Sequence, residues 1–138
     1  VAPASLVEPS PRGAGRARVY HRRVLSRWGP VVAWAAVIFA FSSIPSLSSG
    51  LGTWDLILRK CAHATEYAIL AILLYRPIGR ELPAFLIGFA YAITDELHQE
   101  FVQGRHASPF DVSMDAAGLV LGLLVLHATR LTVQSQRG

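Results

Sequence analysis

The sequence has a single cysteine, Cys61, and few charged residues for its length. One cysteine excludes an intrachain disulfide framework. Asp, Glu, Lys and Arg together make up 16% of the 138 residues, whereas hydrophobic residues make up 52%. A soluble domain has about 25% charged residues. The composition therefore indicates a single domain that is embedded in a membrane.

Several common enzyme motifs are also absent. The sequence contains no HExxH zinc motif, no glycine-rich phosphate loop and no G-x-S-x-G nucleophile elbow. These absences exclude the usual zinc-protease, nucleotide-binding and α/β-hydrolase patterns. We assign no cofactor and no metal site from the sequence, and whether the chain is an enzyme stays open.

Residues 1–27 combine prolines and glycines with six arginines, and they show no periodic apolar pattern. We predict a disordered, basic cytoplasmic tail over this range. The arginines border an apolar run, which favours an anchor on anionic lipid over a nucleic-acid-binding arm. The expected partner is therefore the lipid bilayer, with no nucleic acid.

Four apolar runs follow the tail and predict four helices. The runs are Trp28–Ile44, Trp54–Tyr75, Leu82–Ile93 and Phe110–Ala128. A helix needs about 20 residues to cross a bilayer, and the third run reaches that length by continuing into polar residues. We predict an all-α integral membrane protein with four transmembrane helices in a small bundle.

The predicted four-span domain covers residues 28–130, and residues 131–138 form a short cytoplasmic tail. A signal peptide is an alternative for the first run. We favour a retained helix because no small-x-small cleavage site follows it. A soluble four-helix bundle is the other alternative, but it would need a polar face on each helix. Val31 to Phe41 in the first run and Leu119 to Leu126 in the fourth have essentially no polar residues.

The positive charges are unevenly divided between the two sides of this predicted membrane domain. Ten of the 13 Lys and Arg residues lie on the side of the N-terminal tail. The positive-inside rule then places both termini in the cytoplasm. With that topology, most of the ionisable residues of the spans lie at the depth of the outer leaflet.

Polar residues concentrate at the outer ends of the second, third and fourth spans and in the loop between the last two. Spacings of three and four residues place several of them on shared helix faces. The candidate pocket residues are Lys60, His63, Glu66, Tyr67, Asp95, Glu96, His98, Gln99, Arg105, Asp111 and Asp115. A charged side chain at mid-bilayer costs roughly 2.5–3.5 kcal/mol, so these groups should face each other or a water-filled cleft.

We expect Lys60 or Arg105 to pair with one of the carboxylates at positions 95, 96 and 111. Gly118 and Gly122 form a small-x-x-x-small pair on the fourth span, which predicts a close helix–helix contact. Two interpretations of the polar residues stay open. They either hold the helices in register or line a pocket that opens to the outer leaflet.

The pattern of these residues resembles the VanZ-like family. The matching motifs are Phe41-Ser42-Ser43-x-Pro45, Lys60-x-x-His63-x-x-Glu66-Tyr67, Asp95-Glu96-x-x-Gln99-x-Phe101-Val102-x-Gly104-Arg105, Asp111-Val112 and Gly118-x-x-x-Gly122. The resemblance covers about residues 37–125. Gln103 stands where members usually have Pro, and Asp115 stands where they usually have Asn.

The resemblance implies a multi-pass protein of the bacterial inner membrane. It also implies an association with low-level teicoplanin resistance, and it brings no particular reaction with it. A pocket with cationic Lys60, His63, His98 and Arg105 would suit the phosphate of a lipid head group. We therefore expect the pocket to bind a lipid-linked or lipid-tailed cell-envelope ligand.

Two other functions remain as alternatives. The histidines and carboxylates could serve a metal-dependent hydrolase of a lipid-linked substrate. A transporter or channel would need several copies of so small a chain, and the sequence leaves the oligomeric state open.

Overall fold

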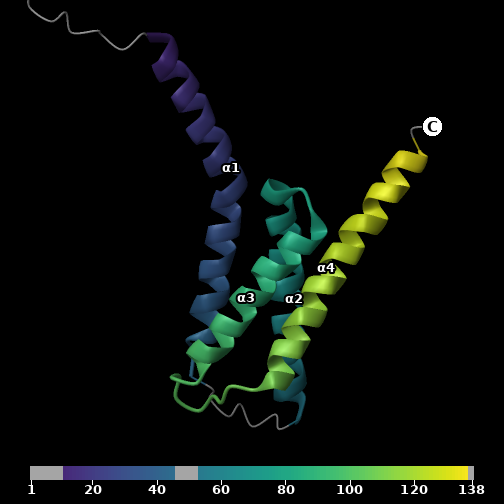
Figure 1. The fold of residues 1–138 in the computed structure, drawn as a ribbon. Helices are drawn as coiled ribbons and strands as arrows, with labels where there is room; N and C mark the ends of the chain where they lie inside the picture. The colour runs from purple at the N-terminus through teal and green to yellow at the C-terminus, as the bar shows by residue number, and fades with distance from the viewer. Residues whose placement is uncertain (1–10, 46–52, 137–138) are drawn as a thin grey trace, which may run out of the picture.

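The computed structural model describes residues 11–45 and 53–136, which form four α-helices (Figure 1). The helices are α1 (Pro11–Ser42), α2 (Thr53–Ile78), α3 (Glu81–Gln99) and α4 (Pro109–Ser135). These described residues contain no strand, and the prediction of an all-α fold with four helices is confirmed. Each predicted apolar run corresponds to one helix.

Helix α1 begins much earlier than the sequence predicts. Residues 11–27 are helical and belong to α1, whereas the sequence favours a disordered tail for this segment. Residues 1–10 of the predicted tail lie outside the described residues. Pro11 occupies the first helical position, where its missing N–H costs no hydrogen bond. Six arginines, which have high helix propensity, lie in this segment beside one proline and two glycines, which favour a loop.

The predicted C-terminal tail is also partly helical, because α4 continues to Ser135. At its other end α4 begins at a Ser-Pro pair. The Ser108 hydroxyl accepts the N–H of Phe110 at 3.2 Å, and Pro109 follows as the first helical residue. Helix α2 ends before Gly79, which has φ 72° and donates its N–H to Tyr75 O at 2.8 Å.

Helix α2 lies at the centre of the bundle and contacts each of the other helices. Its side chains Tyr67, Leu70 and Leu74 are almost completely buried. They form one core with side chains of the three neighbouring helices. Those are Ile38 of α1, Ala84 and Ala92 of α3, and Leu119 and Leu123 of α4. Figure 1 shows α2 behind α3 and between α1 and α4.

The contact between α2 and α4 is the most extensive in the bundle, and small residues bring the two backbones together. A Cβ atom at Gly118 would lie 3.0 Å from Cα of Ala64, and still closer to its carbonyl oxygen. A Cβ atom at Gly122 would lie 2.9 Å from Cα of Ala68 and again closest to the carbonyl oxygen. Both glycines of the small-x-x-x-small pair therefore lie in this helix–helix contact.

Two of the described helices are long and apolar enough to cross a membrane. They are the Arg22–Ser42 part of α1 and all of α4. The sequence predicts four spans, and length and composition support two of them. Helices α2 and α3 do not meet this condition, since each carries ionisable residues along part of its length.

Carboxylates are buried beside the apolar core, and large apolar side chains are exposed. Asp95, Glu96 and Asp115 are at most 4% exposed. Many large apolar side chains cover the outside instead, among them Val32, Phe39, Leu82, Leu86, Leu97, Val120, Leu121 and Leu124. Soluble proteins almost never bury carboxylates fully, and large exposed apolar surfaces mark contact with a partner or a membrane.

Candidate functional site

The candidate site lies at one end of the bundle. Helices α1 and α3 end there, and α2 and α4 begin there (Figure 1). Residues 100–108 connect α3 to α4 across the same end. The structure therefore brings the predicted polar residues of three helices and one loop to a common end of the bundle.

Asp95 is the centre of a buried network that joins α3 to α1. The Ser42 hydroxyl donates to Asp95 Oδ2 at 2.6 Å, and Gln99 Nε2 donates to the same oxygen at 3.2 Å. Ser42, Asp95 and Gln99 are all buried. These hydrogen bonds replace the water that a buried carboxylate has lost, and they fix the end of α1 on α3.

Arg105 extends this network from the loop. Its Nη1 donates to Gln99 Oε1 at 3.0 Å. Its Nε donates to the backbone carbonyl of Ile44 at 3.1 Å, and its Nη2 donates to that of Phe41 at 3.2 Å. Gly104, with φ 78°, forms the turn that presents Arg105 to these acceptors. The guanidinium is thus used to hold the end of α1 against α3.

The half-buried position of Arg105 also affects its ionisation. Burial lowers the pKa of the guanidinium from its ordinary value, and nearby carboxylates act in the opposite direction. An arginine side chain nevertheless stays protonated in proteins. All three of its hydrogen bonds are therefore charge-assisted.

His98 faces α1 on the other side of this network. Its ring stacks on Phe39 with centroids 4.3 Å apart, and its Nε2 lies 3.1 Å from the Ser43 hydroxyl. Ser42 and Ser43 were not among the predicted site residues. They belong to the Phe-Ser-Ser-x-Pro motif, whose position at the end of an apolar run was the available signal.

A second group of predicted residues lies between α2 and α4. His63 Nδ1 is 3.4 Å from Asp115 Oδ1, and Lys60 forms an ion pair with Asp111. Lys60 also lies over the ring of Phe110, 4.6 Å from its centroid. The expected pairing of Lys60 with one of three carboxylates is present, with Asp111 as the partner.

Tyr67 and Glu66 lie deeper in the bundle than this ion pair. Tyr67 is fully buried, and its ring centroid is 6.5 Å from that of His63. The backbone carbonyl of Glu66 accepts the indole N–H of Trp34 at 2.9 Å, which connects α2 to α1. The Glu66 Oε2 atom is buried and has no hydrogen-bond partner among the described residues.

Two carboxylates at the end of α3 fix the loop that leads to α4. Glu96 Oε1 accepts the N–H of Ser108 at 2.7 Å, and Glu100 Oε2 accepts the N–H of Ala107 at 2.6 Å. Glu96 is 4% exposed, whereas Glu100 is exposed. Glu100 was not predicted as a site residue, because nothing in its spacing sets it apart from a solvated charge.

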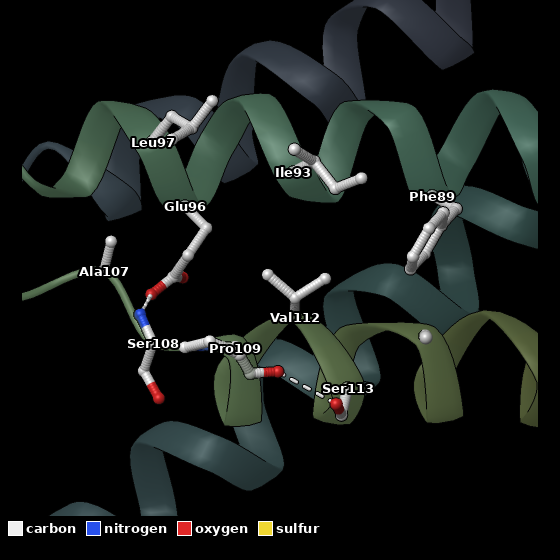
Figure 2. A pocket seen from close by; sticks show the side chains of 10 residues that line it. Phe89, Ile93, Glu96, Leu97, Ala107, Ser108, Pro109, Val112 and Ser113 are labelled. Carbon is white, nitrogen blue, oxygen red and sulfur yellow. Dashed lines mark hydrogen bonds between the residues drawn. The ribbon is translucent and has the colours of Figure 1, made fainter.

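A groove of about 740 Å³ lies between α3 and the first turns of α4. Its walls are mostly apolar, and Glu96 and Ser108 lie at the end nearest the loop (Figure 2). The lining residues are Phe89, Ile93, Glu96, Leu97, Ala107, Ser108, Pro109, Val112, Ser113 and Ala116. Most of these were not predicted, since an apolar groove wall has the same sequence pattern as a lipid-facing helix surface.

The arrangement of the described His, Cys, Asp and Glu side chains does not point to a metal centre. Within residues 11–45 and 53–136, no three His, Cys, Asp or Glu side chains are arranged so that they could hold a metal ion. The histidines of the candidate site are instead divided between separate contacts, with His63 beside Asp115 and His98 beside Ser43.

An all-α bundle with buried carboxylates, an apolar exterior and two helices long enough to cross a membrane has the features of an integral membrane protein. The family model VanZ/LLP1 matches residues 9–130. The chain therefore belongs to the VanZ/LLP1 family, as the motifs indicated. No curated protein and no solved structure matches the chain.

Proposed function

We propose that the chain is a four-span protein of the bacterial inner membrane that binds a lipid-linked or lipid-tailed cell-envelope ligand between α3 and α4. The groove beside Glu96 is the observation that carries this proposal. Its volume lies within the range of about 300–1,000 Å³ that is usual for ligand pockets, and it combines apolar walls with one carboxylate.

The lengths of α2 and α3 support the four-span arrangement. They contain 26 and 19 residues, and a helix that crosses a membrane needs roughly 17–25 residues. The buried side chains of α3 include Asp95, Glu96 and Gln99, and Lys60, His63 and Glu66 of α2 are partly buried. The mean hydropathy of each helix counts these buried polar groups together with the apolar outer face, which lowers its value for α2 and α3.

The charges support an orientation with both termini in the cytoplasm. Arg76 lies in the last turn of α2, Arg80 precedes α3, and Arg130 lies near the end of α4. These helix ends lie at the opposite end of the bundle from residues 100–108 (Figure 1). Under the positive-inside rule, the groove and the polar network then lie in the outer leaflet.

An outer-leaflet groove is accessible to ligands that act at the outer membrane surface. Lipid-linked precursors of the cell wall and lipid-tailed glycopeptides such as teicoplanin both reach that surface. In this proposal the lipid tail lies along the apolar walls and the polar part lies near Glu96 and Ser108. Sequestration of such a tail would give the family's association with teicoplanin resistance a physical basis.

Filling the groove tests this proposal. We expect Val112→Trp to weaken the binding of a lipid-tailed glycopeptide at least tenfold, because the indole would occupy the space of the tail. Val112 lines the groove from α4. Binding is measured on the purified protein in phosphatidylcholine nanodiscs, with a glycopeptide that lacks the tail as the comparison ligand.

Val32→Trp is the matched control, since Val32 is 66% exposed on α1 and does not line the groove. It should leave the affinity within about twofold of the original protein. The proposal is wrong if the tailless glycopeptide binds equally well, or if Val112→Trp and Val32→Trp have the same affinity as the original chain.

A further inference from the structure

The polar end of the groove carries an unused hydrogen-bond acceptor. Glu96 is the one charged residue among the described residues that line the groove. Its Oε1 accepts the N–H of Ser108, while its Oε2 is buried and has no hydrogen-bond partner among the described residues. In Figure 2 the carboxylate extends from α3 toward Ser108, at the loop end of the groove. A buried acceptor without a donor is costly, so a donor on the ligand would be favoured here.

The N-terminus of α4, beside the same end of the groove, is not free to bind an anion. Helix N-termini bind phosphates through their first N–H groups. Here the N–H of Ser108 is bonded to Glu96, and that of Phe110 is bonded to the Ser108 hydroxyl at 3.2 Å. The N–H of Asp111 is bonded to Ser108 O at 2.9 Å, and Pro109 has no N–H. Glu96 therefore already takes the place that an anionic ligand would need.

The cations predicted to hold a phosphate are committed to other groups. Arg105 donates to Gln99 and to two backbone carbonyls at the end of α1. Lys60 is paired with Asp111, His63 lies beside Asp115, and His98 lies between Phe39 and Ser43. None of these four side chains lines the groove. Among the described residues, each of these four side chains therefore already has a partner away from the groove.

We propose that the groove selects an amphiphile whose head group is a protonated amine over one whose head group is a phosphate. This inference rests on the amphiphile-binding function proposed above and specifies the head group for it. Glu96 Oε2 has no hydrogen-bond donor among the described residues. An ammonium group would supply a donor and a positive charge opposite to that of the carboxylate. A phosphate would instead meet a carboxylate of the same sign, without a free cation among the groove-lining residues.

Three probes of equal chain length test the head-group preference. They are a long-chain alkylamine, the corresponding alcohol and the corresponding alkyl phosphate. Their dissociation constants are measured by native mass spectrometry on the full chain in a nonionic detergent. The amine should bind at least tenfold more tightly than the phosphate, with the neutral alcohol between them.

Two matched glutamine variants locate the source of this preference. Glu96→Gln keeps an oxygen for the N–H of Ser108 but replaces Oε2 by an NH₂ donor. This variant should bind the alkylamine about tenfold more weakly and the alkyl phosphate more tightly than the original chain does. Its affinity for the alcohol should be unchanged. Glu100→Gln is the control, because Glu100 also accepts a loop N–H but is exposed and does not line the groove. It should change none of the three constants by more than about twofold.

The results separate this inference from the function on which it rests. The head-group preference is wrong if the alkyl phosphate binds the original chain as tightly as the alkylamine does. It is also wrong if Glu96→Gln leaves the dissociation constants of both probes unchanged. The groove function then still stands, provided Val112→Trp blocks all three probes. If no probe binds, or Val112→Trp has no effect, both proposals fail. The amine-to-phosphate ratio of the original chain decides the question even where Glu96→Gln does not fold.

Discussion

Replacing Arg105 with alanine should lower the free energy of unfolding by about 2–4 kcal/mol, since three charge-assisted hydrogen bonds are lost together. Two of them end on the carbonyls of Phe41 and Ile44, at and just beyond the end of α1. Carbonyls at a helix C-terminus lack partners within the helix, and besides Arg105 the Phe41 carbonyl accepts the N–H of Ile44 at 3.1 Å. The third ends on Gln99, which is buried and bonded to Asp95. The change is measured by denaturant unfolding in detergent micelles.

Arg105→Lys distinguishes the geometry of the guanidinium from its charge. A lysine keeps the positive charge, but a single ammonium cannot reach three acceptors that the planar fork reaches together. We expect lysine to recover less than half of the lost stability. His106→Ala is the control, because His106 is the exposed neighbour in the loop, and it should change stability by less than about 0.5 kcal/mol.

The alternative role for Arg105 gives a different result. A guanidinium that served mainly to bind the ligand's phosphate would lose affinity on substitution while the free energy of unfolding stayed close to that of His106→Ala. That result would contradict the structural role that the three hydrogen bonds assign to Arg105.

Gly122→Ala should also destabilise the bundle, by about 1–3 kcal/mol, because the added methyl group has no space to enter. Its Cβ would lie 2.8 Å from the carbonyl carbon of Ala68 and closer to the oxygen. These are backbone atoms of α2, so relief requires α2 and α4 to move apart along their whole contact. Overpacking of this kind typically costs about 1–3 kcal/mol. Thermal unfolding in detergent, followed by circular dichroism, measures the effect.

Gly29→Ala is the matched control for this prediction. Gly29 also lies within a helix, but a Cβ atom there would meet nothing within 4 Å. Alanine should therefore be neutral or raise stability by up to about 1 kcal/mol, through its higher helix propensity. Equal effects of the two substitutions would show that helix propensity, and not the close contact of α2 with α4, determines the result.

The fold could be predicted from the sequence because its main signals are local. Four apolar runs separated by Pro, Gly and Ser clusters correspond to four helices, and the two glycines at a spacing of four lie in the α2–α4 contact. The start of α1 could not be predicted in the same way. The proline and two glycines of residues 11–27 are typical of a disordered tail, whereas the six arginines favour a helix.

The candidate site was only partly predictable, because some of its hydrogen-bond acceptors are backbone carbonyls. Spacing indicated that Asp95 and Gln99 share one helix face and that Lys60 and His63 share another, and the charge-derived topology placed both faces at the same membrane depth. Spacing cannot show that Arg105 would bond to backbone carbonyls, because every residue carries one and none is distinguished in the sequence. The groove was missed for a related reason. Its walls come from apolar positions of α3 and α4 that resemble any lipid-facing surface.

The structure changes the chemical character of the predicted pocket. The sequence indicated a cluster rich in both signs of charge and suited to phosphate. In the described residues, Lys60 and His63 are each placed beside a carboxylate, and Arg105 is placed on helix-end carbonyls. Among the described residues that line the groove, Glu96 is the charged one, and its Oε2 atom is a hydrogen-bond acceptor without a partner. The sequence indicates the end of the bundle at which the polar residues gather, whereas the groove and its ligand preference depend on the contacts that the fold makes there.

The orientation of this end of the bundle is best tested by cysteine accessibility in intact cells. Cys61 is exposed and is first replaced by alanine, and single cysteines are then placed at Gln103 or Ser135, which are exposed at opposite ends of the bundle. A membrane-impermeant maleimide should label position 103 in intact cells and label position 135 only after lysis. Labelling of 135 but not 103 would place the groove on the cytoplasmic side, and labelling of both or neither would contradict a four-span bundle with an outward-facing site.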